Sequence, residues 1–140
     1  MNFGSSFGIS ASALTAQRLR MDVISSNIAN AETTRASVVD GKAVPYRRKM
    51  VVLEATPREK FSDILNSTLN ASSNKGVRVQ AITEDSSPLK PVYNPSHPDA
   101  DNNGYVYMPN VDITKEMVDM LSASRSYEAN VTMLNASKAM

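Results

Sequence analysis

The chain has 140 residues, 41% of them hydrophobic, which suits one or two small domains with a buried core and argues against disorder along its whole length. Fifteen basic and fourteen acidic residues leave a formal net charge of +1, which excludes a bulk field that recruits nucleic acid or acidic lipid. The absence of cysteine excludes disulfides, thiol catalysis and cysteine-bound zinc.

The first ten residues carry neither a charged region nor an apolar run long enough for a cleavable signal peptide. The sequence also lacks any stretch of about 18 consecutive apolar residues, the length that a membrane-spanning helix needs. We therefore expect a soluble chain without Sec-type export and without direct membrane insertion. A secreted destination would need a route that does not cleave the chain.

Glycine and proline are concentrated in the middle of the sequence. All seven prolines and three of the five glycines lie between Gly41 and Pro109. Because these residues normally interrupt regular structure, their scarcity on both sides predicts a long helix at each end, over 9–32 and 112–140. Either Asp112 or Asn110 is expected to cap the second helix.

Apolar residues recur with heptad spacing in both predicted helices. The first helix has one series that starts at Phe7 and a second that starts at Phe3, and together they predict an a/d seam. The second helix has series that start at Ile113 and Met117. The residues predicted to form the helix seam and to pack subunits are Leu14, Met21, Ile24, Ile28, Ile113, Met117, Met120, Tyr127, Val131 and Leu134.

Two terminal helices of similar length, separated by a segment rich in glycine and proline, predict an α+β fold. The helices form an antiparallel coiled coil, and a small β-rich insert lies between them. The predicted organisation assigns 1–35 and 110–140 to the two helices of the coiled-coil domain and 36–109 to the insert. Further apolar residues lie off the seam, so a second stripe of each helix must be covered by the insert or by other copies of the chain. We favour other copies, because the insert looks too short to cover both helices.

The insert shows several strand patterns. Segments 46–55, 76–85 and 104–110 carry β-branched and aromatic residues between turn signals, and 61–70 has the pattern of a short helix. Segment 86–104 contains four prolines and is expected to be an irregular, extended loop.

One stretch of that loop resembles the start of a calcium-binding loop. Asp99, Asp101 and Asn103 alternate before a glycine, but Asn110 stands where a closing glutamate is required. A tight turn that leads into a strand is the favoured interpretation. His97 is the only histidine, so a histidine pair for a metal is excluded, and we interpret it as a polar turn residue. We expect no catalytic site, no metal and no cofactor.

The densest positive cluster is Arg47, Arg48 and Lys49, next to Tyr46. Three charges do not form a stripe for nucleic acid, and no glycine-rich phosphate loop accompanies them. On a strand they would alternate between the two faces, so we interpret them as a solvated edge that discourages stray pairing.

Asn27 and Asn30 lie three residues apart in a run of Ala, Ser and Thr. On a helix they would flank the seam, where small neighbours allow another backbone to approach and buried amides fix the register. The alternative is a solvent-facing helix end, where asparagine is tolerated.

Both ends of the sequence resemble one protein family. The stretch LTAQRLRMDVISSNIANAETT (14–34) resembles the N-terminal signature of bacterial flagellar rod and hook proteins, with its Asn-Ile-Ala-Asn core. Segment 97–140 is similar to the C-terminal half of a proximal-rod member of that family, in its His-Pro-Asp-Ala, Met-Pro-Asn-Val and Ser-Arg-Ser-Tyr elements. Ser26 and Arg35 depart from the residues that the family often has. The positions that carry the signature here are Asn27, Ala29, Asn30, Ser124, Arg125 and Asn130.

The resemblance implies a structural subunit of the proximal rod of the flagellar basal body. Such a subunit assembles with copies of itself and with other flagellar rod proteins into a helical, periplasm-spanning tube that transmits torque. It is exported unfolded by the flagellar type III export apparatus without a cleaved signal peptide. The resemblance assigns packing, and not catalysis, to the signature residues. A helical adaptor or export chaperone that binds one partner without polymerising remains the alternative.

Overall fold

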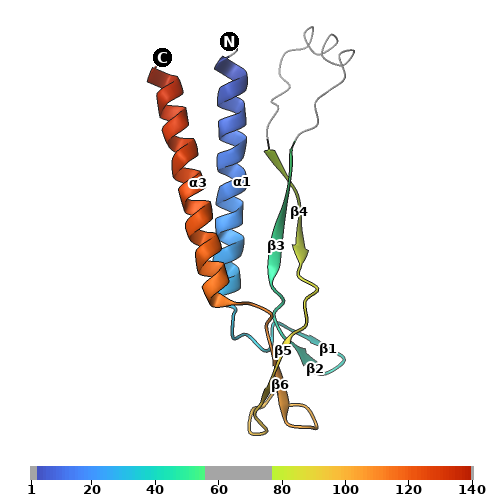
Figure 1. The fold of residues 1–140 in the computed structure, drawn as a ribbon. Helices are drawn as coiled ribbons and strands as arrows, with labels where there is room; N and C mark the ends of the chain where they lie inside the picture. The colour runs from blue at the N-terminus through green and yellow to red at the C-terminus, as the bar shows by residue number, and fades with distance from the viewer. Residues whose placement is uncertain (1–2, 56–76, 140) are drawn as a thin grey trace.

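A computed structural model describes residues 3–55 and 77–139, and its fold is α+β, as predicted. The short strands lie between two helices in the sequence, and the two helices lie side by side in space (Figure 1). The predicted short helix at 61–70 lies outside the described residues. The elements are α1 (Phe3–Ala29), β1 (Ser37–Val39), β2 (Lys42–Val44), β3 (Lys49–Ala55), β4 (Val77–Glu84), β5 (Lys90–Tyr93), β6 (Tyr105–Met108) and α3 (Ile113–Ala139).

The two helices have well-defined inner ends. α1 ends at Ala29, earlier than predicted, and the Asn30 side chain donates a hydrogen bond to the Ser26 carbonyl (2.9 Å) just beyond the end of the helix. α3 begins after Asp112, whose carboxylate accepts a hydrogen bond from the Thr114 N–H (3.1 Å). This bond satisfies one of the free N–H groups of the first turn, so Asp112 is confirmed as the capping residue.

The described strands form three antiparallel hairpins, β1–β2, β3–β4 and β5–β6. In the first hairpin, Asp40 and Gly41 both have positive φ (52° and 76°), the backbone that a two-residue hairpin turn requires. In the second, the register shifts between Val52 and Leu53, where the ladder carries an irregularity. The three predicted strands are confirmed with shorter bounds.

The interpretation of 86–104 as an irregular loop is wrong at one point, because this segment contains β5. Val92 of β5 pairs with Val106 of β6 although Pro91 stands beside it. A two-stranded ribbon tolerates a proline whose missing N–H faces away from the partner strand. At the turn before β6, Gly104 has φ 83°, and a Cβ there would lie 3.0 Å from the Tyr93 ring.

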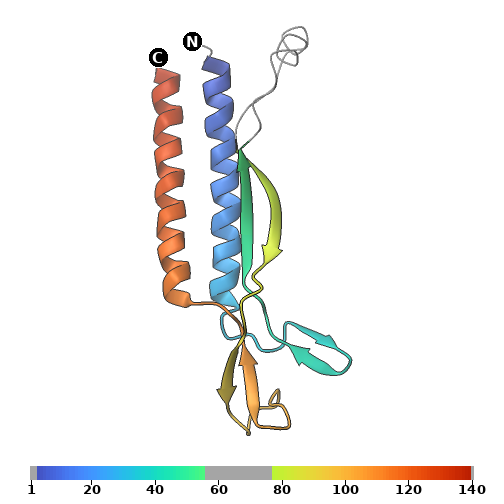
Figure 2. The same cartoon turned by 45° about the vertical axis from the view of Figure 1, so that its right-hand side comes forward.

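The helical half of the molecule has three layers, α3, α1 and the β3–β4 hairpin, with α1 in the middle (Figures 1 and 2). The helices run in opposite directions, so both ends of the chain lie at one end of the helix pair, and the β1–β2 and β5–β6 hairpins lie at the other. α1 contacts α3, β3 and β4, whereas α3 makes no comparable contact with the described strands.

This layering divides the apolar residues unequally between the helices. On α1, Ala16, Val23 and Ile24 are buried, and Val23 lies in a small pocket beside Val51 of β3. The insert therefore covers the middle of the second stripe of α1, which we had predicted to be covered by other copies of the chain, whereas Ile9 of the same stripe is 44% exposed.

The residues predicted for the seam of α3 and for subunit packing include Ile113 and Met117. Both side chains are exposed, and Glu116 and Ala123 are the residues of α3 that are buried. Because Glu116 turns inward to polar partners, the next residue is rotated by about 100° and Met117 points away from the seam. The small Ala123 side chain has no exposed area, so no space separates it from its surroundings.

The other predicted seam residues lie on covered or partly covered surfaces. Ile24 is buried. Seven residues have intermediate exposure: Leu14, Met21, Ile28, Met120, Tyr127, Val131 and Leu134.

Candidate functional site

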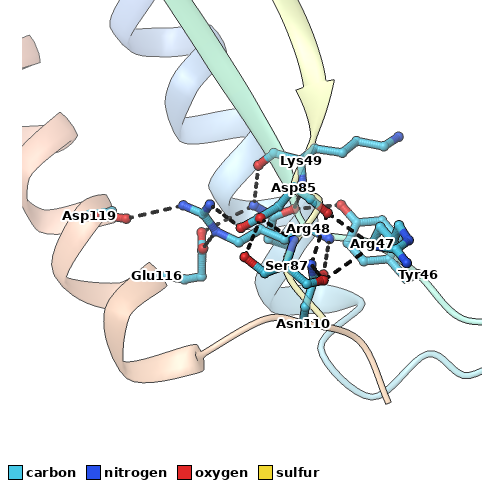
Figure 3. A network of polar contacts seen from close by, with 10 residues as sticks. Tyr46, Arg47, Arg48, Lys49, Asp85, Ser87, Asn110, Glu116 and Asp119 are labelled. Carbon is cyan, nitrogen blue, oxygen red and sulfur yellow. Dashed lines mark hydrogen bonds and ion pairs between the residues drawn. The ribbon is translucent and has the colours of Figure 1, made fainter. Parts of the chain in front are cut away.

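The most developed site is a cluster of polar side chains at the point where the last turn of α1, the first turns of α3 and the base of the β3–β4 hairpin meet (Figure 3). We call this cluster the polar junction. It consists of Asn27, Tyr46, Arg48, Asp85 and Glu116.

Asn27 ties α1 to the start of β3. Its amide oxygen accepts hydrogen bonds from the Lys49 N–H (2.9 Å) and the Tyr46 hydroxyl (2.7 Å). Its amide nitrogen donates to the Lys49 carbonyl (2.9 Å) and to a Glu116 carboxylate oxygen (3.3 Å). All four hydrogen-bonding positions of the amide are therefore occupied, and the side chain has no exposed area. A satisfied amide of this kind fixes one arrangement of its neighbours.

Arg48 ties the hairpin to α3. Its Nε donates to Glu116, and its Nη1 donates to Asp85 at 3.1 Å (Figure 3). A third carboxylate, that of Asp119, lies 3.8 Å from Nη2. The Arg48 side chain is 15% exposed and the Glu116 side chain is fully buried. A buried carboxylate is strongly unfavourable without a partner, so the position of Glu116 depends on Arg48.

The backbone at the junction is also bonded. The Arg48 N–H donates to the Asn110 side-chain oxygen (2.8 Å), and the Arg48 carbonyl accepts from the Asp85 N–H (2.8 Å). The Asn110 amide nitrogen donates in turn to the carbonyls of Asp85 and Ser87, each at 3.1 Å. Asn110, the second residue that we had considered as a cap of α3, thus holds the segment that leads into α3 against the hairpin.

The charges of the junction shift two pKa values. Burial lowers the pKa of Arg48, but hydrogen bonds and charges from Glu116 and Asp85 outweigh burial and leave that pKa raised. Hydrogen bonds from the Ser87 hydroxyl and N–H lower the pKa of Asp85 against an opposing effect of burial, and Arg48 lowers it further. Both groups are therefore held in their charged forms.

The interpretation of the positive cluster as a solvated edge is wrong for Arg48 and Arg47. Arg47 donates to the carbonyls of Asp85 and Ser87, each at 3.3 Å. Only Lys49 is exposed, and its ammonium lies 5.9 Å from the centre of the Tyr46 ring. The acidic partners of Arg48 follow 37 and 68 residues later in the chain, so the local sequence does not reveal them.

The polar residues of the predicted turn hold their own loop together. The Asp101 carboxylate accepts hydrogen bonds from the N–H groups of Asn103 and Tyr105, each at 2.9 Å. His97 Nδ1 accepts from the Asp99 N–H (3.0 Å). Within 3–55 and 77–139, no three His, Asp or Glu side chains are grouped so that they could hold a metal ion.

Asp99 joins this loop to the segment after α1. Its carboxylate accepts hydrogen bonds from Arg35 (2.6 and 3.1 Å) and from the Thr34 hydroxyl (2.8 Å). These bonds, those from Arg35 above all, lower the pKa of Asp99. Arg35, where the resemblance to the rod family is imperfect, thus has a defined partner in this chain.

The signature residues are not gathered into one site. Asn27 belongs to the polar junction, and Asn30 accepts a hydrogen bond from the Thr33 hydroxyl (3.1 Å) beyond the end of α1. Ala29 and Arg125 are exposed, and Ser124 and Asn130 have intermediate exposure. Sequence reasoning did not identify Tyr46, Arg48, Asp85 and Glu116 as a site, because no short motif connects them.

A second candidate surface lies on α3, on the side turned away from α1. Val118 and Leu121 are 59% and 62% exposed there, with the charged Arg125 and Glu128 beyond them. We call these four residues the outer face of α3. Met117 and Met133 add exposed apolar area on its flanks.

Comparisons with known proteins agree at both ends of the chain. Residues 7–36 match the family described as flagella basal body rod protein, and residues 102–140 match the C-terminal family of the flagellar basal body rod FlgEFG proteins. Three similar proteins are each named flagellar basal-body rod protein FlgC. The Bacillus subtilis protein is 60% identical over 96% of this chain and 91% of its own length. The Borreliella burgdorferi protein is 46% identical over 100% and 93%, and the Salmonella typhimurium protein is 44% identical over 96% and 89%.

The chain therefore belongs to the flagellar basal-body rod proteins and, among them, to the FlgC family. It is a structural subunit of the rod and not an enzyme. The alternative of an adaptor or export chaperone is not favoured by these relatives. Neither described helix is both long and apolar enough to cross a membrane.

Proposed function

We propose that the chain assembles with copies of itself and with other rod proteins through its terminal helices. In the assembly, α1 and α3 pair as a coiled coil in the inner layer of a helical tube that transmits torque, and the strands of the insert face outward. The observation that carries this proposal is the outer face of α3, which remains uncovered in a single chain. Exposed apolar side chains grouped on one side of a helix, here Val118 and Leu121, are typical of protein interfaces.

The helix seam and the signature residues are proposed to serve this packing. Ile113 and Met117, which are exposed, are assigned to contacts between subunits, and the partly covered residues of α3 to contacts with α1. The division into two helices (1–35 and 110–140) and one insert (36–109) is proposed as the functional organisation of the subunit.

We further propose that the chain reaches the periplasmic rod unfolded, through the flagellar type III export apparatus and without cleavage of a signal peptide. The polar junction supports this order of events, because it joins Asn27 near one end of the sequence to Glu116 near the other. It forms only when both terminal segments are on the same side of the membrane. The absence of cysteine agrees with folding in a compartment where disulfides form.

The test replaces Leu121 by Asp, in a bacterium whose own copy of this subunit has been deleted. Because Leu121 is mostly exposed in the single chain, the purified variant should melt like the wild type. An unpaired carboxylate at a buried interface is unfavourable by several kcal/mol, so swimming and the recovery of rods in isolated basal bodies should be lost. The matched control, Leu121→Met, keeps an apolar side chain and should swim normally.

Normal swimming of the Leu121→Asp strain would contradict the assignment of α3 to assembly. Discrete one-to-one complexes in light scattering, without extended assemblies or rings when rod proteins are mixed, would favour the adaptor instead.

A further inference from the structure

We infer that the partner of the outer face of α3 is the exposed side of the β3–β4 hairpin of a second copy of this chain. The inference rests on the proposed function and adds which two surfaces meet. In the helical half, α1 separates α3 from the β3–β4 hairpin (Figure 2). The two surfaces therefore lie on opposite sides of one molecule and cannot cover each other within it.

The exposed side of the hairpin carries apolar residues and one ion pair. Val52 and its cross-strand partner Ala81 are exposed there, in the middle of the hairpin. Nearer the far end, Arg78 donates to the Glu54 carboxylate at 3.1 Å, and the two side chains are 63% and 37% exposed. The outer face of α3 has the same composition, with two apolar residues followed by one basic and one acidic residue.

Positions along both surfaces can be measured from the polar junction, because Asn27 bonds both Glu116 near the start of α3 and Lys49 at the start of β3. Along α3, Leu121 lies five residues beyond Glu116, about 8 Å at 1.5 Å per residue. Along the hairpin, Val52 lies three residues beyond Lys49, about 10 Å at 3.3 Å per residue. Apolar residues on the two surfaces therefore stand at similar heights.

The charged residues match in the same way. Glu128 lies twelve residues beyond Glu116, about 18 Å along α3. Arg78 pairs with Glu54, which lies five residues beyond Lys49, about 17 Å along β3. Two copies placed side by side at one level bring Glu128 opposite Arg78, and Arg125, about 14 Å along α3, near Glu54. In this placement, each charged residue faces one of opposite sign on the other copy.

This contact joins two different surfaces, so each copy keeps one free surface of each kind. Contacts of this type repeat and produce rings or open helical arrays, whereas a contact between two identical surfaces stops at a dimer. The inferred contact is therefore of the kind that a tube requires.

The test exchanges the charges of each surface without changing the composition of the chain. The helix exchange is Arg125→Glu with Glu128→Arg, and the hairpin exchange is Glu54→Arg with Arg78→Glu, which keeps the internal ion pair. Either exchange alone should abolish most swimming, because like charges then meet at every contact. The two exchanges in one chain should restore swimming, and a combined chain that remains defective would overturn the inference.

Disulfide cross-linking gives an independent readout, because the natural chain has no cysteine. A chain with both Leu121→Cys and Val52→Cys should form a ladder of oligomers when oxidised in assembled basal bodies. Each single variant should form none, and a mixture of the two single variants should stop at dimers. Normal rods without the ladder would overturn the inferred contact and leave the proposed function intact. A ladder or dimer from a single variant would also overturn it, and a wild-type chain that builds no rods would refute both.

Discussion

The two helices are equally long, 27 residues each, yet the fold treats them differently. α1 lies between α3 and the β3–β4 hairpin, and its middle turns bury Ala16, Val23 and Ile24. Beyond the polar junction, α3 lies against α1 alone, and its buried residues are Glu116 and Ala123. The short insert thus covers the side of α1 that faces away from α3, and it leaves the outer face of α3 exposed. The first helix therefore lies in the interior of the helical half, and the second carries the surface that we propose for contacts with neighbours.

The largest expected effect comes from Arg48, because it fixes the base of α3 to the hairpin. Arg48→Ala leaves the Glu116 carboxylate buried without its ion-pair partner, which should lower the free energy of unfolding by about 3–5 kcal/mol. Urea denaturation of the purified chain measures this loss.

A matched double variant separates the lost charge from lost packing. Arg48→Met combined with Glu116→Leu removes both charges and keeps apolar volume, so it should recover most of the stability. An Arg48→Ala chain within about 0.5 kcal/mol of the wild type would show that the junction does not hold α3.

A smaller effect should distinguish the two sides of α3. Ala123→Leu forces extra volume into a position with no exposed area and should cost about 1–3 kcal/mol. Ala136→Leu makes the same change at an exposed position and should change stability by less than about 0.5 kcal/mol. Equal melting temperatures for the two variants would mean that both sides of α3 accept a larger side chain equally well.

The smallest expected effect is a pH dependence at the junction. Because the folded chain lowers the pKa of Asp85 below its ordinary value of 3.8, the ionised carboxylate contributes stability above that pH. This contribution is lost as the pH falls through the lower pKa of the folded state. Asp85→Asn should therefore be less stable than the wild type at neutral pH, and the difference should shrink below about pH 4.

Urea midpoints measured from neutral pH down to about pH 3 test this prediction. A difference that does not change with pH would show that the ionisation of Asp85 does not contribute, and that only its hydrogen bonds do.

The sequence was sufficient for the broad architecture. The scarcity of glycine and proline outside the middle segment predicted both helices, and alternating β-branched residues predicted β3, β4 and β6. β5 was missed because Pro91 argues against a strand, and the ribbon that tolerates it is not visible in local sequence.

The seam of α3 shows why apolar periodicity alone was insufficient. Met117 fits the heptad better than Glu116, yet Glu116 is the residue that is buried. Its burial depends on Arg48, which is 68 residues away and lies in a cluster that resembles a solvated edge. Partners that are brought together only by the folded chain are beyond the reach of pattern reasoning from a single sequence.

Because α3 and the β3–β4 hairpin both start at the polar junction, residues inserted into α3 alone would shift it relative to the hairpin. A heptad inserted into α3 shortly after Glu116 would raise every later helical residue by about 10 Å while the hairpin stays in place. The subunit itself could still fold, but its two lateral surfaces would be out of phase with those of its neighbours. In the inferred assembly, the length of α3 beyond the polar junction must therefore match the length of the hairpin in every copy, and neither element can be lengthened alone.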